Sequence, residues 1–403
     1  MQKELYIPVE TLHADIALPA SKSISNRALI LNILSYSPYP IRNLSDSDDT
    51  FVLQKALDSN NTTFDIGAAG TSMRFLTAFL AKTLGEWTIT GSERMKKRPI
   101  KLLVDALNSL GARIEYLENE GFPPLRIFGS ALTGGEIRLD GGVSSQYISA
   151  LMMIAPYMQN GLKIQLEGNV ISKPYIEMTL NMMRKFGVEA SFSGNEIDIR
   201  PQTYTPVDYT VEADWSAASY WYEMLSLAGK GTVMLHGLHK NSYQGDSKVA
   251  ELFTQLGVTT NYSDEGVLLT SNDNYVSFFE YNFIDQPDLA QTFAVTCCLK
   301  NIPFSFCGLQ SLKIKETDRI VALINELKKL GFILCEKGEG NLLWNGERYE
   351  PQKAISIATY DDHRMAMAFA PTALLMPIII ENPQVVSKSY PCFWEDFGKV
   401  SKF

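Results

Sequence analysis

The segment Ser144-Ser-Gln-Tyr-Ile-Ser-Ala-Leu151 places small and polar residues directly before an apolar run of helical character. The same shape occurs at five other places in the 403-residue chain. They are Ser23-Ile-Ser-Asn-Arg-Ala-Leu-Ile-Leu31, Thr71-Ser-Met-Arg-Phe-Leu76, Ser216-Ala-Ala-Ser-Tyr-Trp221, Asp288-Leu-Ala-Gln-Thr-Phe293 and Asp362-His-Arg-Met-Ala-Met367. Successive copies start 48, 73, 72, 72 and 74 residues apart. Chance α/β periodicity would not keep one period over four intervals, so the spacing predicts an internally repeated fold.

A second pattern, an amphipathic helix that ends at a glycine, follows each of the middle four copies. It recurs after 76, 70 and 74 residues, at Gly111, Gly187, Gly257 and Gly331. Glycine is the usual residue just past a helix end. Short alternating runs at 86–90, 162–166 and 231–235 read as strands with one solvated face. We predict six repeats of strand, helix, strand, helix, strand, strand, three in each of two α/β lobes, with a shortened first repeat.

The composition is that of a folded protein, with 45% hydrophobic and 20% charged residues and no low-complexity linker. The length exceeds that of one ordinary core, which favours two domains. A net charge of -9 argues against general nucleic-acid binding, because affinity for the phosphate backbone needs a basic surface. Any anion site in this chain must therefore be local.

The opening segment MQKELYIPVE has no apolar signal core. The longest apolar run, residues 365–380, is interrupted by Pro371 and Pro377 and is too short for a membrane span. Five cysteines without a CxxC pair suggest buried thiols rather than a disulfide framework or a zinc site. We therefore expect a cytoplasmic protein that binds no membrane.

Helix starts and basic residues coincide along the repeats. The first helix of each repeat is expected to open with Ser, Thr or Asp as its cap, which leaves backbone N–H groups pointing outward and attractive to anions. Lys22 and Ser23 would stand at such a start, with Arg27 one turn further on. Arg74 follows residues 67–71, a glycine-containing segment without the lysine of a Walker loop. Phosphate or carboxylate binding is predicted, and a solvated surface charge is the alternative for any single cation.

The loop after Glu93 contains four cations in five residues, and Pro99 is expected at the first position of the next helix. Such a loop is either a solvated surface segment or a lid whose Arg98 closes over a substrate. The sequence alone leaves both interpretations open.

Lys315, Glu316 and Arg319 are expected on one helix, where residues four apart are neighbours. A carboxylate held near cations is how proton donors and acceptors are tuned, although a surface ion-pair ladder would look similar. Asp288 opens a helix of the neighbouring repeat and could be a simple N-cap.

Asp361-Asp362-His363-Arg364 likewise reads as a helix cap followed by a cation. The chain has only four histidines, and none lies at ligand spacing from His363. No metal site is predicted.

Six longer motifs carry a family resemblance. They are Pro-Ala-Ser-Lys-Ser-Ile-Ser-Asn-Arg (19–27), Arg-Met-Lys-Lys-Arg-Pro (94–99), Val-Ser-Ser-Gln (143–146), Ser-Lys-Pro-Tyr (172–175), Lys-Glu-Thr-Asp-Arg (315–319) and Asp-His-Arg-Met-Ala (362–366). Together they resemble the 5-enolpyruvylshikimate-3-phosphate synthase family of enolpyruvyl transferases, from Leu18 to Lys388. The resemblance implies an inside-out α/β barrel fold with two domains of three βαβαββ repeats. One domain would contain residues 1–20 and 213–403, the other 21–212, with the active site in the cleft between them.

The resemblance also implies the substrate-binding residues. Shikimate 3-phosphate would be held by Lys22, Ser23, Arg27, Ser144, Ser145, Gln146, Ser172, Tyr175, Asp288, Ser311 and Lys315. Phosphoenolpyruvate would be held by Lys22, Gly70, Arg98, Gln146, Arg319, Arg364 and Lys388. Supporting positions would be Asp49, Thr71, Arg74 and His363.

The implied reaction belongs to the shikimate pathway, which leads to chorismate and the aromatic amino acids and which glyphosate inhibits. The 5-hydroxyl of shikimate 3-phosphate adds to C2 of phosphoenolpyruvate while C3 is protonated, and phosphate then leaves. Asp288 would accept the hydroxyl proton and Glu316 would protonate C3. Lys315 and Lys22 would take part in the catalysis.

Charge balance agrees with this implication. Two phosphates and two carboxylates carry roughly five to six negative charges, which repel strongly in a dry site. Lysines, arginines and helix starts can offset that repulsion, so no metal or organic cofactor is needed. The expected partners are the two small-molecule substrates, and we expect a monomer.

Five positions depart from the family pattern. Ala68, Ser311 and Asp361 stand where Asn is common, Lys313 where Arg is usual, and Ser389 where Thr is usual. No proposed acid, base or primary anion contact is lost, but substrate affinity and the response to glyphosate are left open.

Three other functions compete with this interpretation. The sister transferase acting on UDP-N-acetylglucosamine has a Cys in its mobile loop, and residues 91–100 contain none. A phosphometabolite-binding regulator without catalysis is a second alternative. A nucleic-acid end-processing enzyme of related fold is a third, and the acidic composition disfavours it.

Overall fold

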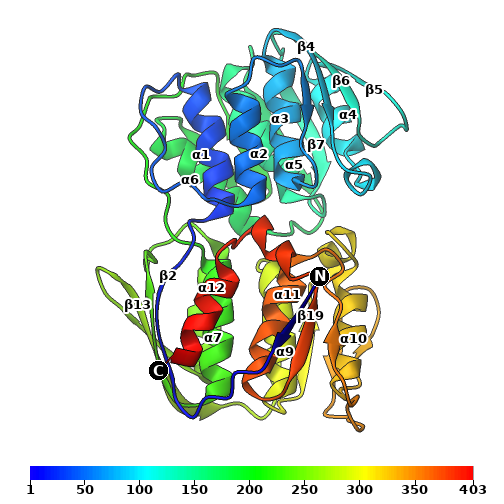
Figure 1. Ribbon diagram of the computed structural model, residues 1–403. Coiled ribbons are helices and arrows are strands. Elements are labelled where there is room, and N and C mark those ends of the chain that lie inside the picture. The colour runs from blue at the N-terminus through cyan, green and yellow to red at the C-terminus, as the bar shows by residue number, and fades with distance from the viewer. Residues whose placement is uncertain (403) are drawn as a thin grey trace. The chain divides into compact units, whose positions relative to one another are not determined.

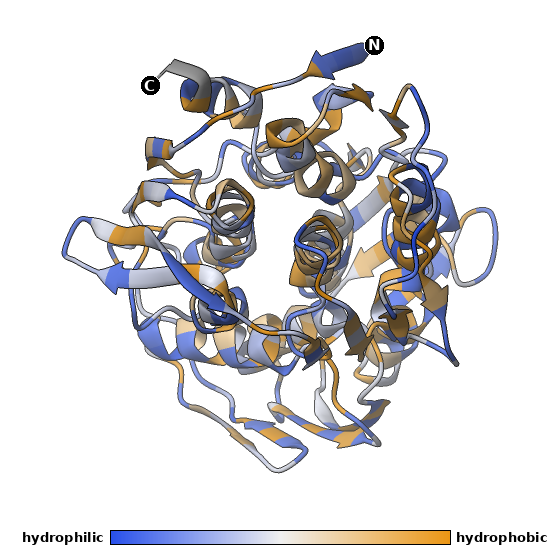
Figure 2. Ribbon diagram, turned by 90° about the horizontal axis from the view of Figure 1, so that it is seen from below, coloured by the Kyte–Doolittle hydropathy of each residue, from blue (hydrophilic) through white to orange (hydrophobic). Residues whose placement is uncertain are grey.

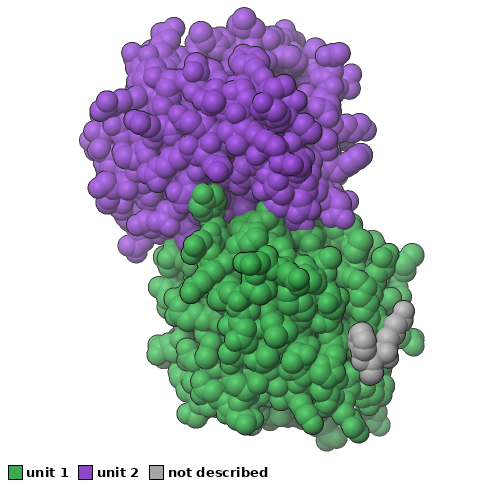
Figure 3. All heavy atoms as spheres, turned by 90° about the vertical axis from the view of Figure 1, so that its left-hand side faces the viewer, with its two compact units in different colours: residues 1–19, 212–403 green, residues 20–211 purple. Residues whose placement is uncertain are grey.

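The computed structural model describes residues 1–402, with only the backbone of 401 and 402. Contacts divide the chain into two compact units (Figure 3). Unit 1 contains Met1–Pro19 and Glu212–Phe403, and unit 2 contains Ala20–Val211. Unit 2 is therefore one continuous segment inserted into the sequence of unit 1. Within residues 1–402, no helix is long and apolar enough to cross a membrane.

Unit 2 contains two complete repeats. The first consists of β3 (Thr63–Asp65), α3 (Gly70–Lys82), β4 (Gly85–Thr90), 3-10 helix η1 (Met95–Lys97), α4 (Lys101–Ser109), β5 (Arg113–Tyr116) and β6 (Leu125–Gly129). The second consists of β7 (Gly135–Asp140), α5 (Ser145–Ile154), η2 (Ala155–Tyr157), β8 (Leu162–Glu167), α6 (Lys173–Lys185), β9 (Ala190–Ser193) and β10 (Glu196–Ile199). The shortened repeat that precedes them supplies α1 (Lys22–Leu34) and α2 (Asp48–Leu57).

Unit 1 also contains two complete repeats, and the first begins with a strand from the N-terminus. It consists of β2 (Leu12–Ala17), α7 (Trp215–Ala228), β11 (Gly231–His236), η3 (Gly245–Lys248), α8 (Val249–Leu252), η4 (Phe253–Gln255), β12 (Leu256–Tyr262) and β13 (Gly266–Tyr275). The second consists of β14 (Phe279–Asn282), η5 (Pro287–Leu289), α9 (Ala290–Leu299), β15 (Phe304–Cys307), η6 (Gln310–Ile314), α10 (Arg319–Lys329), β16 (Cys335–Glu336) and β17 (Leu342–Trp344).

Among the described residues, the last repeat of unit 1 has only three strands, and one of them is the first strand of the chain. It consists of β18 (Ser356–Ile357), α11 (His363–Phe369), η7 (Ala370–Leu374), β19 (Ile378–Glu381), η8 (Pro383–Lys388), α12 (Phe393–Phe397), η9 (Gly398–Lys402) and β1 (Gln2–Leu5). Its sheet has the order β1-β19-β18. β1 thus occupies the place that the fourth strand of a complete repeat would take.

All four complete repeats share one strand order: β3-β4-β6-β5, β7-β8-β10-β9, β2-β11-β13-β12 and β14-β15-β17-β16. In each, the first two strands are parallel and the remaining neighbours are antiparallel. The reason lies in the connections, since parallel strands need a crossover helix whereas antiparallel strands can be joined by a short turn. The repeat predicted from the sequence spacing is thus a physical unit of the fold.

The helices of each unit lie inside and the sheets lie outside. Every residue of α9 from Ala290 to Cys298 is buried, and α11 is buried over its whole length. In contrast, β2 alternates between buried and exposed residues. A helix that is apolar all round belongs in a core, and an alternating strand belongs at a surface. Figure 1 shows α7, α9 and α11 side by side in unit 1, and Figure 2 shows strands of mixed hydropathy toward the periphery.

The predicted helix starts are confirmed only in part. Ser144, Asp214 and Asp362 accept backbone N–H groups as caps of α5, α7 and α11. The prediction is wrong for α3 and α9, whose N-cap residues are Ala69 and Leu289, and α1 has a serine at its N-cap, Ser21, that makes no side-chain cap bond. The chain enters α9 through the 3-10 turn η5, which leaves the Asp288 carboxylate available for other partners.

Glycine ends three of the four predicted amphipathic helices. Gly111, Gly187 and Gly331 follow α4, α6 and α10 with φ between +83° and +100°. The fourth prediction is wrong, because Gly257 lies within β12 and the segment before it is only the short run η3, α8 and η4. Pro99 is also not the first residue of α4, which begins at Lys101.

Candidate active site

Asp288 lies at the centre of an ionic cluster in unit 1. Its Oδ1 is 2.9 Å from Arg319 Nη1, its Oδ2 is 2.9 Å from Arg364 Nη2, and Lys315 Nζ is 3.8 Å from Oδ1. The side chain is only 14% exposed. Burial alone would raise the pKa of Asp288, but Arg364, Lys315 and Arg319 outweigh it and hold the pKa far below its usual value. Asp288 is therefore an ionised hydrogen-bond acceptor in this state.

Arg319 joins three carboxylates. Its Nε donates to Asp362 Oδ2 at 2.6 Å and its Nη2 to Asp362 Oδ1 at 3.2 Å. The remaining bonds go to Asp288 and, at 2.9 Å, to Glu316 Oε2. Burial lowers the pKa of Arg319, but the three carboxylates together raise it above its ordinary value. The planar guanidinium suits this bidentate role, and an added anion would have to compete with these carboxylates.

The segment Lys315–Asp318 differs from the sequence prediction. Lys315, Glu316 and Arg319 were expected on one helix, but η6 ends at Ile314 and α10 begins at Arg319. The cause is Asp318, whose Oδ1 accepts the N–H groups of Ile320 and Val321 at 3.1 Å and so caps the helix there. Glu316 still reaches Arg319, so the predicted group of charges is brought together by a loop.

Lys315 completes the cationic side of the cluster. Removal from water lowers its pKa, an effect that Asp288 opposes and Arg319 reinforces. Ser311, another predicted substrate contact, lies one turn earlier in η6.

Arg364 and Lys388 come from the last repeat. Arg364 is the second residue of α11, and besides Asp288 its Nη1 lies 3.5 Å from the hydroxyl of Tyr220 on α7. Lys388 ends η8 and donates from Nζ to the carbonyl oxygen of Asp361 at 2.6 Å. Both cations are thus tied to the segment that leads into α11.

His363 is buried beside Asp362, with 3.7 Å between Nδ1 and Oδ1. Among residues 1–402, no group of three or more His, Cys, Asp and Glu side chains is arranged to hold a metal ion. The functional groups described at this site are carboxylates, guanidinium groups and ammonium groups.

Arg27 in unit 2 is a buried cation surrounded by hydroxyl groups. It donates from Nε to Thr179 Oγ1 at 2.7 Å, from Nη2 to Ser149 Oγ at 2.9 Å and from Nη1 to the Ser23 carbonyl at 3.0 Å. Burial lowers its pKa to about 10, and the ring of Tyr175 lies 5.9 Å away. Arg27 forms no ion pair within the described part of the chain. A buried cation of this kind is stabilised by an incoming anion.

Lys22 stands at the first position of α1, with Ser23 next to it. Its Nζ lies 3.6 Å from Asp49 Oδ2, at the start of α2. Both side chains are mostly buried. The positive end of α1 and the ammonium group therefore coincide, as the sequence predicted.

Arg98 packs against the backbone of Gly70. A Cβ atom at position 70 would lie 2.5 Å from Arg98 Nη1, so only glycine fits here without displacing the guanidinium. Arg74 fixes the same loop, because it donates to the Gly70 carbonyl at 3.1 Å and to the Pro99 carbonyl at 3.0 Å. Arg74 is thus a support for Arg98.

Two further helix starts of unit 2 present the remaining predicted residues. Ser144 caps α5, Ser145 follows it, and Gln146 Nε2 donates to Thr71 Oγ1 at 3.1 Å. Ser172 precedes α6 in the left-handed region, with φ of 52°. The first turn of α6 carries Tyr175.

Sequence reasoning missed several groups at these places. Ser149, Thr179 and Tyr220 contact the predicted arginines, yet they look like ordinary helix residues. Asp246 was also missed: it is buried and accepts a hydrogen bond from Ser216 Oγ. Burial, then repulsion by Asp288, raises its pKa to about 7. Of these missed residues, only Asp246 has a carboxyl group that could have marked it as a candidate from its residue type. It lies in none of the sequence motifs, so the sequence did not single it out.

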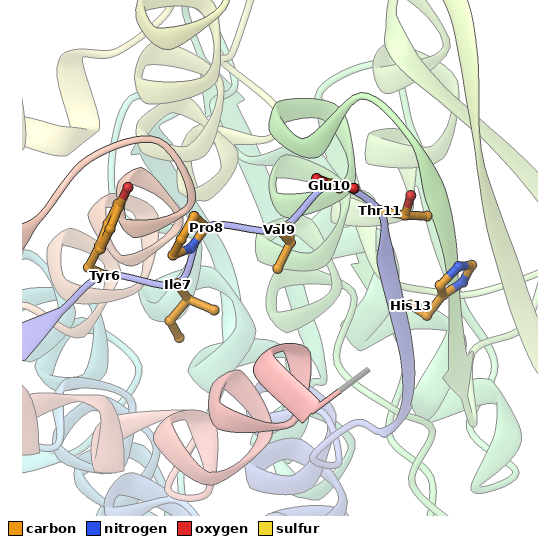
Figure 4. Close-up of a pocket in the computed structure, with 7 residues that line it drawn as sticks. All are labelled: Tyr6, Ile7, Pro8, Val9, Glu10, Thr11 and His13. Carbon is orange, nitrogen blue, oxygen red and sulfur yellow. The ribbon is translucent and has the colours of Figure 1, made fainter.

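One pocket of unit 1 lies elsewhere. It has a volume near 530 Å³ and is lined by residues 6–11 and His13 (Figure 4). Its described lining residues include none of the predicted site residues.

Comparison with known sequences identifies the family. Residues 52–397 match the family model of EPSP synthase (3-phosphoshikimate 1-carboxyvinyltransferase). A Bacteroides fragilis protein of the name 3-phosphoshikimate 1-carboxyvinyltransferase is 57% identical over 390 residues, 96% of this chain and 95% of the relative. A protein of the same name from Vibrio cholerae is 37% identical over 427 aligned positions, covering 98% of each chain.

Solved structures confirm the fold class. An EPSP synthase from Acinetobacter baumannii superposes with a TM-score of 0.78 at 19% identity and covers 99% of this chain and 98% of its own. A second structure of the Acinetobacter baumannii protein gives 0.77 at 18% identity. The resemblance drawn from six short motifs is therefore confirmed over almost the full length, and this chain belongs to the EPSP synthase (3-phosphoshikimate 1-carboxyvinyltransferase) family.

Proposed function

We propose that this enzyme transfers the enolpyruvyl group of phosphoenolpyruvate to the 5-hydroxyl of shikimate 3-phosphate and releases phosphate, the carboxyvinyl transfer after which its family is named. The observation that carries the proposal is the state of Asp288, an ionised carboxylate with three cations around it. Anionic substrates are attracted to those cations, and the carboxylate next to them can take up a proton. An anion-binding protein without catalysis would not need that carboxylate.

Shikimate 3-phosphate is assigned to two sets of residues. Unit 2 would supply Lys22, Ser23, Arg27, Ser144, Ser145, Gln146, Ser172 and Tyr175, and unit 1 would supply Asp288, Ser311 and Lys315. The buried guanidinium of Arg27 supports this assignment, since a phosphate would give it the counter-charge that it lacks among the described residues. The helix starts of α1, α5 and α6 supply further N–H donors.

Phosphoenolpyruvate is assigned to Lys22, Gly70, Arg98, Gln146, Arg319, Arg364 and Lys388. Glycine at position 70 supports this assignment, because the absence of a Cβ lets the Arg98 guanidinium pack closely against the backbone there. In unit 1, Arg364 is bonded to Asp288 and Lys388 to a backbone carbonyl, and a substrate carboxylate or phosphate would compete for both. That competition has a chemical consequence.

When a cation turns from Asp288 toward a substrate, the pKa of Asp288 rises. The carboxylate then becomes a better base for the 5-hydroxyl proton. The hydroxyl oxygen forms its bond to C2 of phosphoenolpyruvate, while C3 gains a proton and becomes a methyl group. In the second step the bond from C2 to the phosphate oxygen breaks, C3 loses a proton, and the enol ether and phosphate are formed.

Glu316 is the proposed donor to C3, and Lys315 and Lys22 are proposed to assist. Glu316 accepts a hydrogen bond from Arg319, and its side chain is 21% exposed, so it can reach solvent and substrate. Asp49, Thr71, Arg74 and His363 are proposed to hold neighbouring groups in place. Asp49 pairs with Lys22, and Thr71 with Gln146.

The alternative acceptor, UDP-N-acetylglucosamine, is disfavoured because the matching relatives bear the name of the shikimate enzyme. We further propose a monomer in the cytoplasm. Cys297 and Cys298 are deeply buried, and burial raises the pKa values of both thiols, but Cys335 and Cys392 are exposed, so the expectation of buried thiols is wrong for those two. All five cysteines are reduced thiols in the described part of the chain, which suits a reducing compartment.

Phosphate release from the two substrates together tests the proposal. Phosphate and an enol ether product of the expected mass should form at equal rates. Phosphoenolpyruvate alone and phosphoenolpyruvate with UDP-N-acetylglucosamine serve as controls. Release with the UDP sugar, or none with shikimate 3-phosphate, would overturn the assignment.

A further inference from the structure

Glu326 is a buried carboxylate outside the Asp288 cluster but on the same helix as Arg319. It is 1% exposed and lies seven residues after Arg319 in α10. Seven residues are two helical turns, so the two side chains leave the helix on the same face. Both therefore meet the same neighbouring segment.

That segment is the stretch from β18 to α11. Glu326 Oε2 accepts the N–H of Ala358 at 3.0 Å and the ammonium group of Lys329 at 2.6 Å. Its Oε1 accepts the hydroxyl of Tyr360 at 2.7 Å. Lys329 donates in addition to the Ser356 carbonyl at 2.8 Å. Helix α10 thus bonds both to the backbone and to a side chain of residues 356–360.

The held segment contains an unfavourable turn. Tyr360 and Asp361 have φ of 54° and 55°, two consecutive residues other than glycine in the left-handed region. Such conformations persist only where the surroundings enforce them. Glu326 contacts one side of this turn, and Arg319 binds Asp362 directly after it. Helix α10 therefore holds the turn at both ends.

The turn carries the proposed phosphoenolpyruvate-binding cations of the last repeat. The carbonyl oxygen of Asp361, which the left-handed conformation orients, accepts Lys388 Nζ at 2.6 Å. Asp362 Oδ1 accepts the N–H of Arg364 at 2.9 Å and fixes the start of α11. A shift of the turn would move both cations.

We propose that Glu326 is a positioning residue, which holds the left-handed turn at 360–361 and through it sets the positions of Lys388 and Arg364. The identity of the ligand rests on the proposed function, whereas the coupling of Glu326 to the turn does not. Glu326 touches no substrate in this scheme. Its effect passes through the backbone of the turn.

Tyr360 is suited to a permanent bond of this kind. Burial first, and then the adjacent Glu326, raise the pKa of Tyr360 to about 12. The phenol therefore stays a neutral donor at every pH at which the enzyme would work. Ionisation of the phenol therefore does not break the hydrogen bond from Tyr360 to Glu326 over that range.

The substitution E326Q tests the proposal, because it keeps the size of the side chain and turns one acceptor oxygen into an amide donor. E381Q is the matched control: Glu381, on β19, accepts the hydroxyl of Ser356 on β18 at 2.7 Å, but makes no hydrogen bond to Tyr360 or Asp361 within the described residues. We expect E326Q to raise the KM for phosphoenolpyruvate about five- to tenfold. The KM for shikimate 3-phosphate and kcat should change less than about threefold, and E381Q should resemble the wild type.

Hydrogen exchange of the backbone supplies a readout that needs no activity. In E326Q the amides of Ala358, Asp362 and Arg364 should exchange at least about tenfold faster than in the wild type, and in E381Q they should not. Y360F, which removes one hydroxyl and leaves the carboxylate, should raise the KM for phosphoenolpyruvate two- to threefold. If E326Q does not fold, Y360F tests the same hydrogen bond between Tyr360 and Glu326.

Relief of the strained turn provides a rescue. D361G removes the Cβ that disfavours the left-handed conformation, so E326Q/D361G should reverse at least half of the rise in the KM for phosphoenolpyruvate. Unchanged exchange in E326Q, an equal rise of both KM values, or no recovery in the double variant would each overturn the proposal. If the wild type releases no phosphate, the proposed function fails, and the exchange comparison still decides the role of Glu326.

Discussion

Replacing Asp288 by Asn tests whether this carboxylate accepts a proton during catalysis or only forms ion pairs with the neighbouring cations. The cluster sets Lys315, Arg319 and Arg364 against three carboxylates, so it is close to neutral. D288N keeps the shape of the side chain and leaves one positive charge in excess. Anion binding should therefore strengthen while turnover falls, a combination that loss of folding cannot produce.

The size of the effect follows from the geometry. An anion about 6 Å from position 288 would lose roughly 3 kcal/mol of repulsion at an effective dielectric constant of about 20. Relaxation of the cluster and solvent reaching the 14% exposed side chain reduce this value. We expect phosphoenolpyruvate to bind about tenfold more tightly, or about 1.4 kcal/mol. Loss of the base should lower kcat by a factor of roughly 100 to 10,000.

Calorimetry with phosphoenolpyruvate, with shikimate 3-phosphate present, gives the affinity, and phosphate release gives kcat. D285N is the matched control, because it makes the same charge change three residues away and Asp285 forms no ion pair among residues 1–402. A kcat near that of the wild type in D288N would refute the role as base. Binding no tighter than in D285N would refute the electrostatic reasoning.

Four other substitutions address single steps. E316Q should lower kcat at least about 100-fold with the calorimetric Kd for shikimate 3-phosphate within about threefold, and normal turnover would remove Glu316 from proton transfer. R27M should weaken shikimate 3-phosphate binding at least tenfold, since a hydrogen bond to a charged group contributes about 1.5 to 3 kcal/mol; an unchanged Kd would contradict the assignment of Arg27. G70A should raise the KM for phosphoenolpyruvate about tenfold by displacing Arg98, and an equal KM would show that the close contact is unimportant. Asp246 has a folded-state pKa of about 7, above its unfolded value of about 4, so its ionisation costs stability as the pH rises through that window. D246N should therefore raise Tm more at pH 8, where the whole cost is present, than at pH 5, where only part of it is, and the same shift at both pH values in a thermal scan would argue against this titration.

The repeat could be predicted from sequence because each copy obeys local rules. Gly111, Gly187 and Gly331 end helices where only a positive φ fits, and that requirement is visible in one residue. The helix expected before Gly257 does not form as one element, because the segment is divided into η3, α8 and η4. Directly before this run, the amide oxygen of Gln244 accepts the N–H of Trp215, a contact between residues 29 positions apart. Such tertiary contacts leave no local pattern.

The candidate site shows the same limit. Residue types and helix starts pointed to Lys22, Arg27 and Arg364, because charge and position are local properties. Partners are not local: Arg27 is held by Thr179, which lies 152 residues away and resembles any other helix residue. Nor did spacing reveal that Asp318 ends the loop before α10, since the alternative of a longer helix satisfied the same periodicity.

Because β2 pairs with β11, this strand is synthesised long before the strand that it pairs with. The partner of Leu12–Ala17 is made more than 200 residues later, which at about 5 to 20 residues per second is a delay of roughly 10 to 40 s. All strands of Ala20–Val211 are complete before then. A nascent chain halted just after residue 211 would carry the inserted half already able to fold, and in front of it a strand with open edges still waiting for its partner.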